Sequence, residues 1–322
     1  AVRLRGALER RAALLADPPT DALRLLGPGD RSTAVTIDRY GPGAVLTIAD
    51  GPNDVTESIR RAAAVVLEEL APMGVAAVYY KPLPRDRSRL GGAMPAVMTD
   101  PSPAAGEPLP EAILVHEHGC RFEVRLYDGF STGLFFDQRE NRRALMQGVR
   151  GKRVLNTFAY TGAFSVACGL AGAETTTVDI SKKYLEWAKR NFGHNRIDTE
   201  KHFFNRMDTF EFFRLARRKN LRYELIILDP PTFAAGSKRD DVAPFSAERD
   251  YPRLLTEAME LLTPRGRVFA STNARALCEG QRFRGTIEKA IGRRPIYLPL
   301  PEHPADLEGE TGRLAAALFT IR

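Results

Sequence analysis

The fold of this chain is decided by one stretch, Arg153-Val154-Leu155-Asn156-Thr157-Phe158-Ala159-Tyr160-Thr161-Gly162-Ala163-Phe164. An apolar run ends there in a small polar loop, and a helical pattern begins at Ala163. Strand, tight loop and helix in this order are typical of the first crossover of an open α/β sheet, where ligands bind at the carboxyl ends of the strands. The next predicted strand, residues 175–178, leads to Asp179, whose carboxylate is placed to accept hydrogen bonds from two ribose hydroxyls.

The composition of the loop favours one class of nucleotide. A dinucleotide-binding turn would show G-x-G-x-x-G, whereas this loop has the single glycine Gly162, which allows close approach of a ligand. Pyrophosphate needs several exposed amides at a helix N-terminus, but a ligand without phosphate needs only one close approach. The loop therefore favours S-adenosylmethionine over NAD. The alternative is an ordinary strand–turn–helix unit in which Asp179 is a solvated acid.

Two later strands also end on acids. Residues 203–208 form a predicted third strand ending on Asp208, which would face the adenine edge, where a carboxylate can accept from the exocyclic amine. Residues 224–228 are almost continuously apolar, as in a central strand covered on both faces, and lead into Asp229-Pro230-Pro231-Thr232-Phe233. The prolines stiffen this loop and remove two amide donors, while its carbonyls still accept. Phe233 is expected either to stack on a substrate base or to join the core.

A polar segment precedes the organising strand. Residues 131–143 start with a glycine turn and then place Asp137, Gln138, Arg139 and Asn141 close together. A helix cap alone would not need so many hydrogen-bonding groups. We therefore expect this segment to form a lip over the cofactor pocket.

Composition and charge limit the possible partners. No apolar run approaches the roughly 20 residues that a membrane helix needs, and we expect a cytoplasmic protein without a membrane partner. The net charge is +7; residues 1–108 hold 13 Lys and Arg and 13 Asp and Glu, so the whole excess lies in residues 109–322. A basic catalytic half suits an anionic partner such as RNA, although a scattered, solvated basic surface is the alternative.

The sequence predicts two domains on either side of a proline-rich linker, residues 100–110. Residues 1–108 read as a small α+β domain that is a candidate for substrate binding. It has a helical pattern over residues 1–26, which Pro18-Pro19 breaks, and a helix over 55–70. Residues 109–322 form the catalytic domain, which begins with a β-hairpin at 111–129. His116 and His118 lack a third ligand, so we expect no metal site.

Residues 109–322 closely resemble the bacterial class I S-adenosylmethionine-dependent methyltransferases that act on 23S ribosomal RNA. The resemblance rests on four ordered motifs: Gly133-Leu134-Phe135-Phe136-Asp137-Gln138-Arg139, Asn156-Thr157-Phe158-Ala159-Tyr160-Thr161-Gly162, Thr177-Val178-Asp179 and Asp229-Pro230-Pro231-Thr232-Phe233. It implies a Rossmann-like α/β sheet, S-adenosylmethionine as cofactor, RNA as substrate, and a monomer or homodimer. Residues 36–40 resemble, more weakly, the middle domain of the same family.

The chain departs from that family at two points. A counterpart of the family's RNA-binding PUA module is missing, which keeps two alternatives open: a methyltransferase acting on a small molecule or protein, and a non-catalytic RNA-binding protein. The members that methylate cytosine C5 carry a nucleophilic cysteine after the fifth strand, where this chain reads Ala270-Ser271-Thr272-Asn273. The chain is nearer the branch that methylates guanine N7.

These observations define the predicted site. The residues expected to hold or face the substrate base are Asp229, Pro230 and Phe233. The residues expected to bind the cofactor are Asp137, Gln138, Arg139, Asn156, Phe158, Tyr160, Gly162, Asp179, Asp208 and Asp229.

Overall fold

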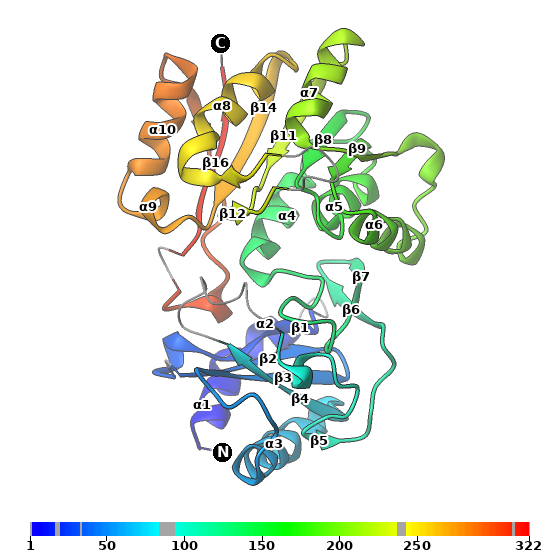
Figure 1. The fold of residues 1–322 in the computed structure, drawn as a ribbon, viewed down its shortest axis with the longest axis vertical. Helices are drawn as coiled ribbons and strands as arrows, with labels where there is room; N and C mark the ends of the chain where they lie inside the picture. Colours follow the sequence, from blue (N-terminus) through cyan, green and yellow to red (C-terminus); the bar gives the residue numbers. More distant parts are fainter. Residues whose placement is uncertain are drawn as a thin grey trace. The chain divides into compact units, whose positions relative to one another are not determined.

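The computed structural model describes residues 2–16, 20–32, 34–83, 94–236, 243–310 and 313–321 (Figure 1). The chain forms two compact units, of which the first comprises Ala1–Arg139 with His303–Glu310 and the second comprises Glu140–Glu302 with Thr311–Arg322. The division therefore differs from the predicted boundary between residues 108 and 109. The hairpin assigned by sequence to the second domain belongs to the first unit, and a segment of the C-terminal half returns to that unit.

Among the described residues, the first unit has a five-stranded sheet in the order β1-β2-β3-β4-β5. The strands are β1 (Ala22–Leu26), β2 (Val35–Tyr40), β3 (Gly43–Ala49), β4 (Ala77–Leu83) and β5 (Ala105–Gly106), and a separate hairpin joins β6 (Ile113–Glu117) to β7 (Cys120–Val124). Neighbours β3 and β4 are parallel, so the chain between them must cross over, and the crossover is the helix α3 (Glu57–Leu70).

The predicted amphipathic helix of the first unit is confirmed as α3. Thr56 caps its N-terminus by accepting a hydrogen bond from the Ile59 amide at 3.4 Å. The side chains of Ile59, Ala63, Val66 and Leu70 are buried and recur at helical spacing. They share one hydrophobic core with side chains of the five-stranded sheet and of the helix α1 (Val2–Arg10).

The predicted helical pattern over residues 1–26, broken at Pro18-Pro19, is confirmed before the prolines and wrong after them. The structure has α1, the short helix α2 (Ala12–Ala16) and then the strand β1. Ala22–Leu26 is apolar enough to read as a helix, but it pairs antiparallel with β2 and has a strand-like burial pattern. Pairing with a distant strand overrides local propensity here. In the same way, the predicted linker contains β5, which pairs with β4.

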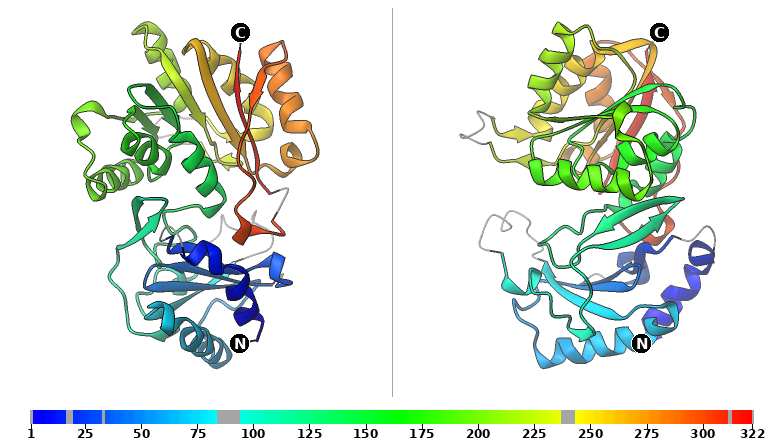
Figure 2. Two further views of the ribbon diagram at one scale, coloured as in Figure 1. Left: turned by 180° about the vertical axis from the view of Figure 1, so that it is seen from behind. Right: turned by 90° about the vertical axis from the view of Figure 1, so that its right-hand side faces the viewer.

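The second unit is built on a sheet in the order β10-β9-β8-β11-β14-β16-β15. Its strands are β8 (Arg153–Thr157), β9 (Glu174–Asp179), β10 (Phe203–Arg206), β11 (Tyr223–Leu228), β14 (Leu262–Thr272), β15 (Ile296–Leu298) and β16 (Ala315–Thr320). The neighbouring strands β10, β9, β8, β11 and β14 run parallel. Strand β16 is antiparallel to both β14 and β15. Figure 2 shows the red β16 beside β14. The predicted α/β class with a mostly parallel sheet is confirmed.

Helices cover both faces of this sheet. They are α4 (Arg139–Leu145), α5 (Ala163–Leu170), α6 (Lys182–His194), α7 (Thr209–Arg218), α8 (Ala247–Met259), α9 (Arg275–Cys278) and α10 (Arg282–Ile291). Side chains of α7, α8 and α10 pack on one face in a core that includes Ile226 and Phe319. Side chains of α4 and α5 pack on the other face against Ile227 and Phe269. Alternate residues of β11 thus face opposite cores, which explains its continuous apolar sequence.

Candidate functional site

The candidate site lies at the carboxyl edge of the seven-stranded sheet. Strands β9, β8 and β11 are parallel neighbours, and Thr157 of β8 pairs with both Val178 of β9 and Leu228 of β11. From β8 the chain first builds outward through β9 to β10, and then on the other side through β11 to β14. The order in which the chain adds strands therefore reverses between β8 and β11. Open α/β sheets bind ligands at such a switch point. The next residues along β9 and β11 are Asp179 and Asp229.

The loop after β8 has an uncommon backbone. Phe158, Tyr160 and Gly162 all have left-handed conformations, with φ of 53°, 52° and 75°. Such a conformation costs a non-glycine residue roughly 1–3 kcal/mol, so surrounding contacts must hold it. The Phe158 ring lies 5.3 Å from that of Phe245, and the Tyr160 ring lies 4.5 Å from that of Tyr184. These aromatic contacts therefore help to hold the loop in its left-handed backbone conformation.

The packing of the protein, without any ligand, already requires a glycine at position 162. We expected it to admit a ligand, but a Cβ atom added there would lie 2.7 Å from the Cβ of Ala188 in α6. Together with the positive φ, this contact explains the glycine by backbone conformation and by the approach of α5 to α6. Its role in cofactor binding stays a prediction.

Asp179 links the loop to the end of β9. Its Oδ2 accepts a hydrogen bond from the Tyr160 amide at 2.8 Å, and its Oδ1 accepts one from the Ser181 amide at 2.8 Å. Burial raises the pKa of Asp179, and the two amide donors offset part of that rise. A carboxylate has about four lone-pair positions, so two more donors such as ribose hydroxyls can still be accepted. The acid therefore fits the ligand class predicted for it.

Two other predicted cofactor residues have clear partners within the protein. Asn156 is buried, and its Nδ2 donates to Ser165 Oγ at 2.9 Å, as does Thr177 Oγ1. Asp208 is the N-cap of α7, and its Oδ1 accepts from the amides of Phe210 and Glu211. Asn156 thus joins β8, α5 and β9, while Asp208 begins the helix that follows β10.

The segment after β11 presents both polar and aromatic groups. Ser271 Oγ donates to Asp229 Oδ1 at 2.6 Å, and Pro230 is buried. Phe233 is 64% exposed in the short strand β12 (Phe233–Ala234), which pairs with β13 (Phe245–Ser246). Of the two expectations for Phe233, a core position is excluded. Its exposed ring is available for stacking on a base.

Asp137, Gln138 and Arg139 of the predicted lip lie in the first unit, whereas Asn141 lies in the second. Asp137 and Gln138 form part of a 3-10 turn, Phe136–Gln138, and Gln138 is buried. Arg139 is fully buried, and its guanidinium donates to both carboxylate oxygens of Asp306, with 3.1 Å between Nη1 and Oδ2. Arg139 therefore makes a buried ion pair with a residue that is distant in sequence. A cofactor role for these three residues stays a prediction.

Sequence reasoning missed two buried polar residues beside Asp229. From the sequence, Ser271 is only one of the four residues 270–273 that stand where the cytosine-C5 enzymes carry a cysteine. Tyr251 lies on the buried face of α8, and its hydroxyl oxygen lies 2.8 Å from the carbonyl oxygen of Ser271 and 3.1 Å from that of Leu228. A tyrosine within an otherwise apolar helix face was the available signal, since a buried phenol needs a hydrogen-bond partner.

Neither a metal site nor a membrane span is found in the part of the chain that the structure describes. His116 Nδ1 lies 3.0 Å from Asp21 Oδ2, and the described residues contain no cluster of three or more metal-ligating side chains. No described helix is long and apolar enough to cross a membrane.

Known proteins share this sequence pattern. Residues 99–296 match a family described as S-adenosylmethionine-dependent methyltransferase. The chain is 38% identical over 293 residues to a protein of Bacillus subtilis (strain 168) provisionally named ribosomal RNA large subunit methyltransferase YwbD, covering 90% of this chain and 70% of that protein. It is 40% identical over 164 residues to ribosomal RNA large subunit methyltransferase K of Neisseria meningitidis serogroup B (strain ATCC BAA-335 / MC58). That match covers 51% of this chain and 46% of the relative, so the chain spans about half of its length.

The fold also matches solved structures. The crystal structure of SMU.776, provisionally described as a methyltransferase and complexed with SAH, is similar with a TM-score of 0.82 and 31% sequence identity. That similarity covers 99% of this chain and 80% of SMU.776.

Proposed function

Because this chain belongs to the S-adenosylmethionine-dependent methyltransferase family, we propose that it methylates a base nitrogen of large-subunit ribosomal RNA, most favourably guanine N7. Family membership confirms the predicted cofactor and enzyme class. The names of the relatives from Bacillus subtilis and Neisseria meningitidis support ribosomal RNA as the substrate. An enzyme with this substrate works in the cytoplasm, and the basic excess in residues 109–322 suits contact with phosphates.

The observation that carries the choice of atom is the lack of a reactive thiol after β14. Cytosine C5 needs a covalent adduct with a thiolate before it can attack a methyl group. Ser271 and Asn273 occupy this region, and Cys278 lies further on, in α9. The Cys278 thiol donates to the carbonyl of Thr272 at 3.3 Å, and burial raises its pKa. A thiol with a raised pKa is a poor nucleophile at neutral pH.

A ring nitrogen needs no such adduct, because it already carries a lone pair. The bound cofactor supplies the activated methyl group as a sulfonium, and the protein supplies alignment. In our proposal Asp229 and the Pro230 carbonyl accept hydrogen bonds from the N1–H and amino group of guanine, and the exposed Phe233 ring stacks on the base. Asp179 holds the ribose of the cofactor. The small first unit contributes to binding of the RNA.

The test is methyl transfer by the purified protein to an unmodified transcript of large-subunit ribosomal RNA, followed by nuclease digestion and mass spectrometry. We expect N7-methylguanosine with the wild type and with the control Cys278→Ala. We expect Asp229→Ala to lose about ten- to hundredfold in rate, the scale for lost hydrogen bonds to a charged group.

Formation of C5-methylcytosine, or loss of activity in Cys278→Ala, would overturn the assignment of the atom. Transfer to a protein or metabolite fraction, with none to RNA, would favour the alternative substrates instead.

A further inference from the structure

A buried polar cluster lies behind the substrate-facing carboxylate at the ends of β11 and β14. Ser271 Oγ donates to Asp229 Oδ1 at 2.6 Å, and both Ser271 and Tyr251 are fully buried. The Tyr251 hydroxyl oxygen lies 2.8 Å from the Ser271 carbonyl oxygen and 3.1 Å from the Leu228 carbonyl oxygen. The cluster therefore connects α8, the carboxyl-terminal parts of β11 and β14, and Asp229.

The position of the cluster in the sheet explains why it can hold Asp229. The pairing of β11 with β14 ends with Leu228 opposite Ala270, so Asp229 lies just beyond it, while Ser271 continues in β14 and pairs with Ala316 of β16. Backbone carbonyls at this edge need donors from outside the ladder. Burial raises the pKa of Tyr251 well above its usual value, so its hydroxyl remains a donor at neutral pH. Its single O–H can donate to the nearer Ser271 carbonyl or to the Leu228 carbonyl, which lie on the two strands that carry Ser271 and Asp229.

From this geometry we propose that Ser271 is a positioning residue for Asp229 and that Tyr251 fixes the position of Ser271. The inference rests on the proposed function, in which Asp229 contacts the substrate base. Rotation of an aspartate carboxylate about its last side-chain bond is weakly restricted by itself. A short hydrogen bond from a fully buried hydroxyl to the charged acceptor removes that freedom. Asp229 then meets the base already oriented, which is the kind of alignment that accelerates transfer.

The first measurement compares the steady-state kinetics for RNA with those for S-adenosylmethionine. In Ser271→Ala we expect kcat/KM for RNA to fall about ten- to hundredfold while KM for S-adenosylmethionine stays within about twofold, because the lost hydrogen bond is the one that orients Asp229 toward the base. In Tyr251→Phe we expect a smaller fall of about two- to tenfold, since a neutral contact is removed.

The matched control is Thr320→Val. Thr320 Oγ1 donates to the Gly266 carbonyl at 2.8 Å, and Thr320 pairs with Arg267 near the other end of β14. This variant removes another strand-to-strand hydroxyl contact but leaves Asp229 untouched, so we expect nearly unchanged kinetics.

A second experiment tests whether Ser271 acts through Asp229. Single-turnover rates should show no further loss when Ser271→Ala is added to Asp229→Ala, because the partner is already gone. In Ser271→Ala alone the acid limb of the pH–rate profile should move to higher pH, since a donor to the ionised carboxylate is missing. Ser271→Thr, which keeps the hydroxyl, should restore the profile.

The outcomes are distinguishable. Additive losses in the double variant, or an unchanged profile in folded Ser271→Ala, would overturn the positioning role while RNA methylation by the wild type stands. The same variants can be followed by carbon NMR of the Asp229 carboxyl group, which needs no substrate. If the wild type fails to methylate RNA, the proposed function fails, whereas an unchanged carboxyl titration in Ser271→Ala would reject the contact itself.

Discussion

Asp179 uses both of its carboxylate oxygens within the protein before it meets a ligand. The Tyr160 amide donates to one oxygen and the Ser181 amide donates to the other. These bonds fix the side chain at the end of β9 and help to hold Tyr160 in its left-handed conformation. One residue therefore supports the loop and, in our proposal, also offers acceptors to the cofactor.

For Asp179→Ala we expect affinity for the cofactor to weaken by roughly 1.5–3 kcal/mol, the value of hydrogen bonds to a charged group. Calorimetry with S-adenosylmethionine or SAH measures it directly. Glu186→Ala is the control, because Glu186 lies on α6 as part of an exposed pair with Lys189. Unchanged affinity in Asp179→Ala would contradict the assignment of this acid.

The pH dependence of binding follows from the direction of the pKa shift. Burial raises the pKa of Asp179, so its ionised form is lost at a higher pH than for an ordinary aspartate. For the same reason the ionised carboxylate opposes folding above that pKa. Affinity for the cofactor should decline as the pH falls through the raised pKa, and this decline should be absent in Asp179→Ala.

At the scale of single elements, α7 depends on the acid that precedes it. Asp208 accepts hydrogen bonds from the Phe210 and Glu211 amides through Oδ1 alone, so Oδ2 takes no part in the cap. The same side chain can therefore begin a helix and face the adenine amine, as the sequence predicts. The two roles can be separated because serine also caps helices well.

We expect Asp208→Ala to lower the free energy of unfolding by about 1 kcal/mol through loss of the cap. Asp208→Ser should retain most of that stability and yet bind the cofactor roughly tenfold more weakly, since it lacks the carboxylate. Urea unfolding and calorimetry on the two variants give both quantities. Wild-type affinity in Asp208→Ser would leave Asp208 as a helix cap only.

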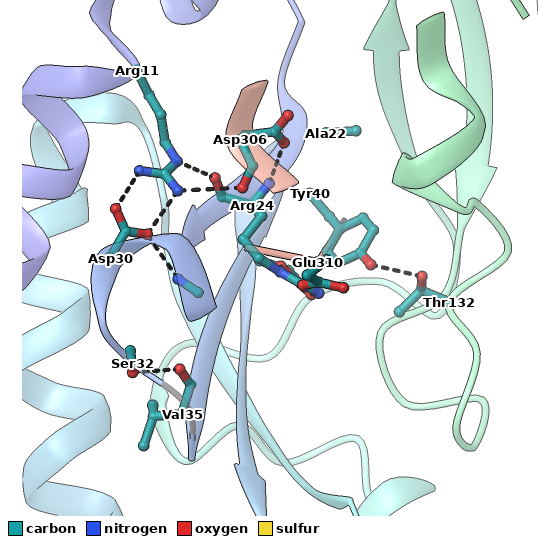
Figure 3. Close-up of polar contacts among 12 residues, drawn as sticks. Arg11, Ala22, Arg24, Asp30, Ser32, Val35, Tyr40, Thr132, Asp306 and Glu310 are labelled. Atoms are coloured by element: carbon teal, nitrogen blue, oxygen red, sulfur yellow. Dashed lines mark hydrogen bonds and ion pairs between the residues drawn. The ribbon is translucent and has the colours of Figure 1, made fainter. Parts of the chain in front are cut away.

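At the scale of the whole molecule, the first unit is built from two segments that are distant in sequence. Asp306, which is fully buried, receives hydrogen bonds from the Arg139 guanidinium and from the Arg24 amide. Figure 3 shows Asp306 among the side chains of Arg11, Arg24 and Asp30, with Arg11 donating to Asp30 and to the Asp306 carbonyl. The segment 303–310 is therefore held by buried charges, although it lies between β15 and β16 of the other unit in sequence.

Breaking a buried pair leaves one charge without compensation, which is strongly destabilising. We expect Asp306→Ala to destabilise the first unit by about 3–5 kcal/mol. This loss should appear as an early transition in urea unfolding of the full chain. Glu308→Ala, an exposed acid of the same segment, is the control and should unfold like the wild type. A single unshifted transition in Asp306→Ala would show that the pair does not hold the unit together.

The sequence by itself determined the features that depend on local patterns. Strand–loop–helix periodicity located the crossover after β8, and the acids Asp179 and Asp229 stand out because each comes at the end of a predicted strand. The carboxyl ends of parallel strands meet at one edge, so these residues were expected to lie at the same edge of the sheet. The prediction of a small α+β unit before the sheet also came from local periodicity, as in α3.

Only the tertiary structure decided which distant groups meet. Ala22–Leu26 became a strand because β2 offers it a ladder, and Arg139 is paired because the chain returns 167 residues later with Asp306. Ser271 of the adjacent strand donates to Asp229, and Tyr251 of α8 contacts the Ser271 carbonyl. None of these contacts leaves a periodic signal, because each depends on the three-dimensional approach of segments that the chain does not place next to one another. Local sequence thus specified the strands and their terminal acids, and long-range pairing specified which buried donors hold those acids in place.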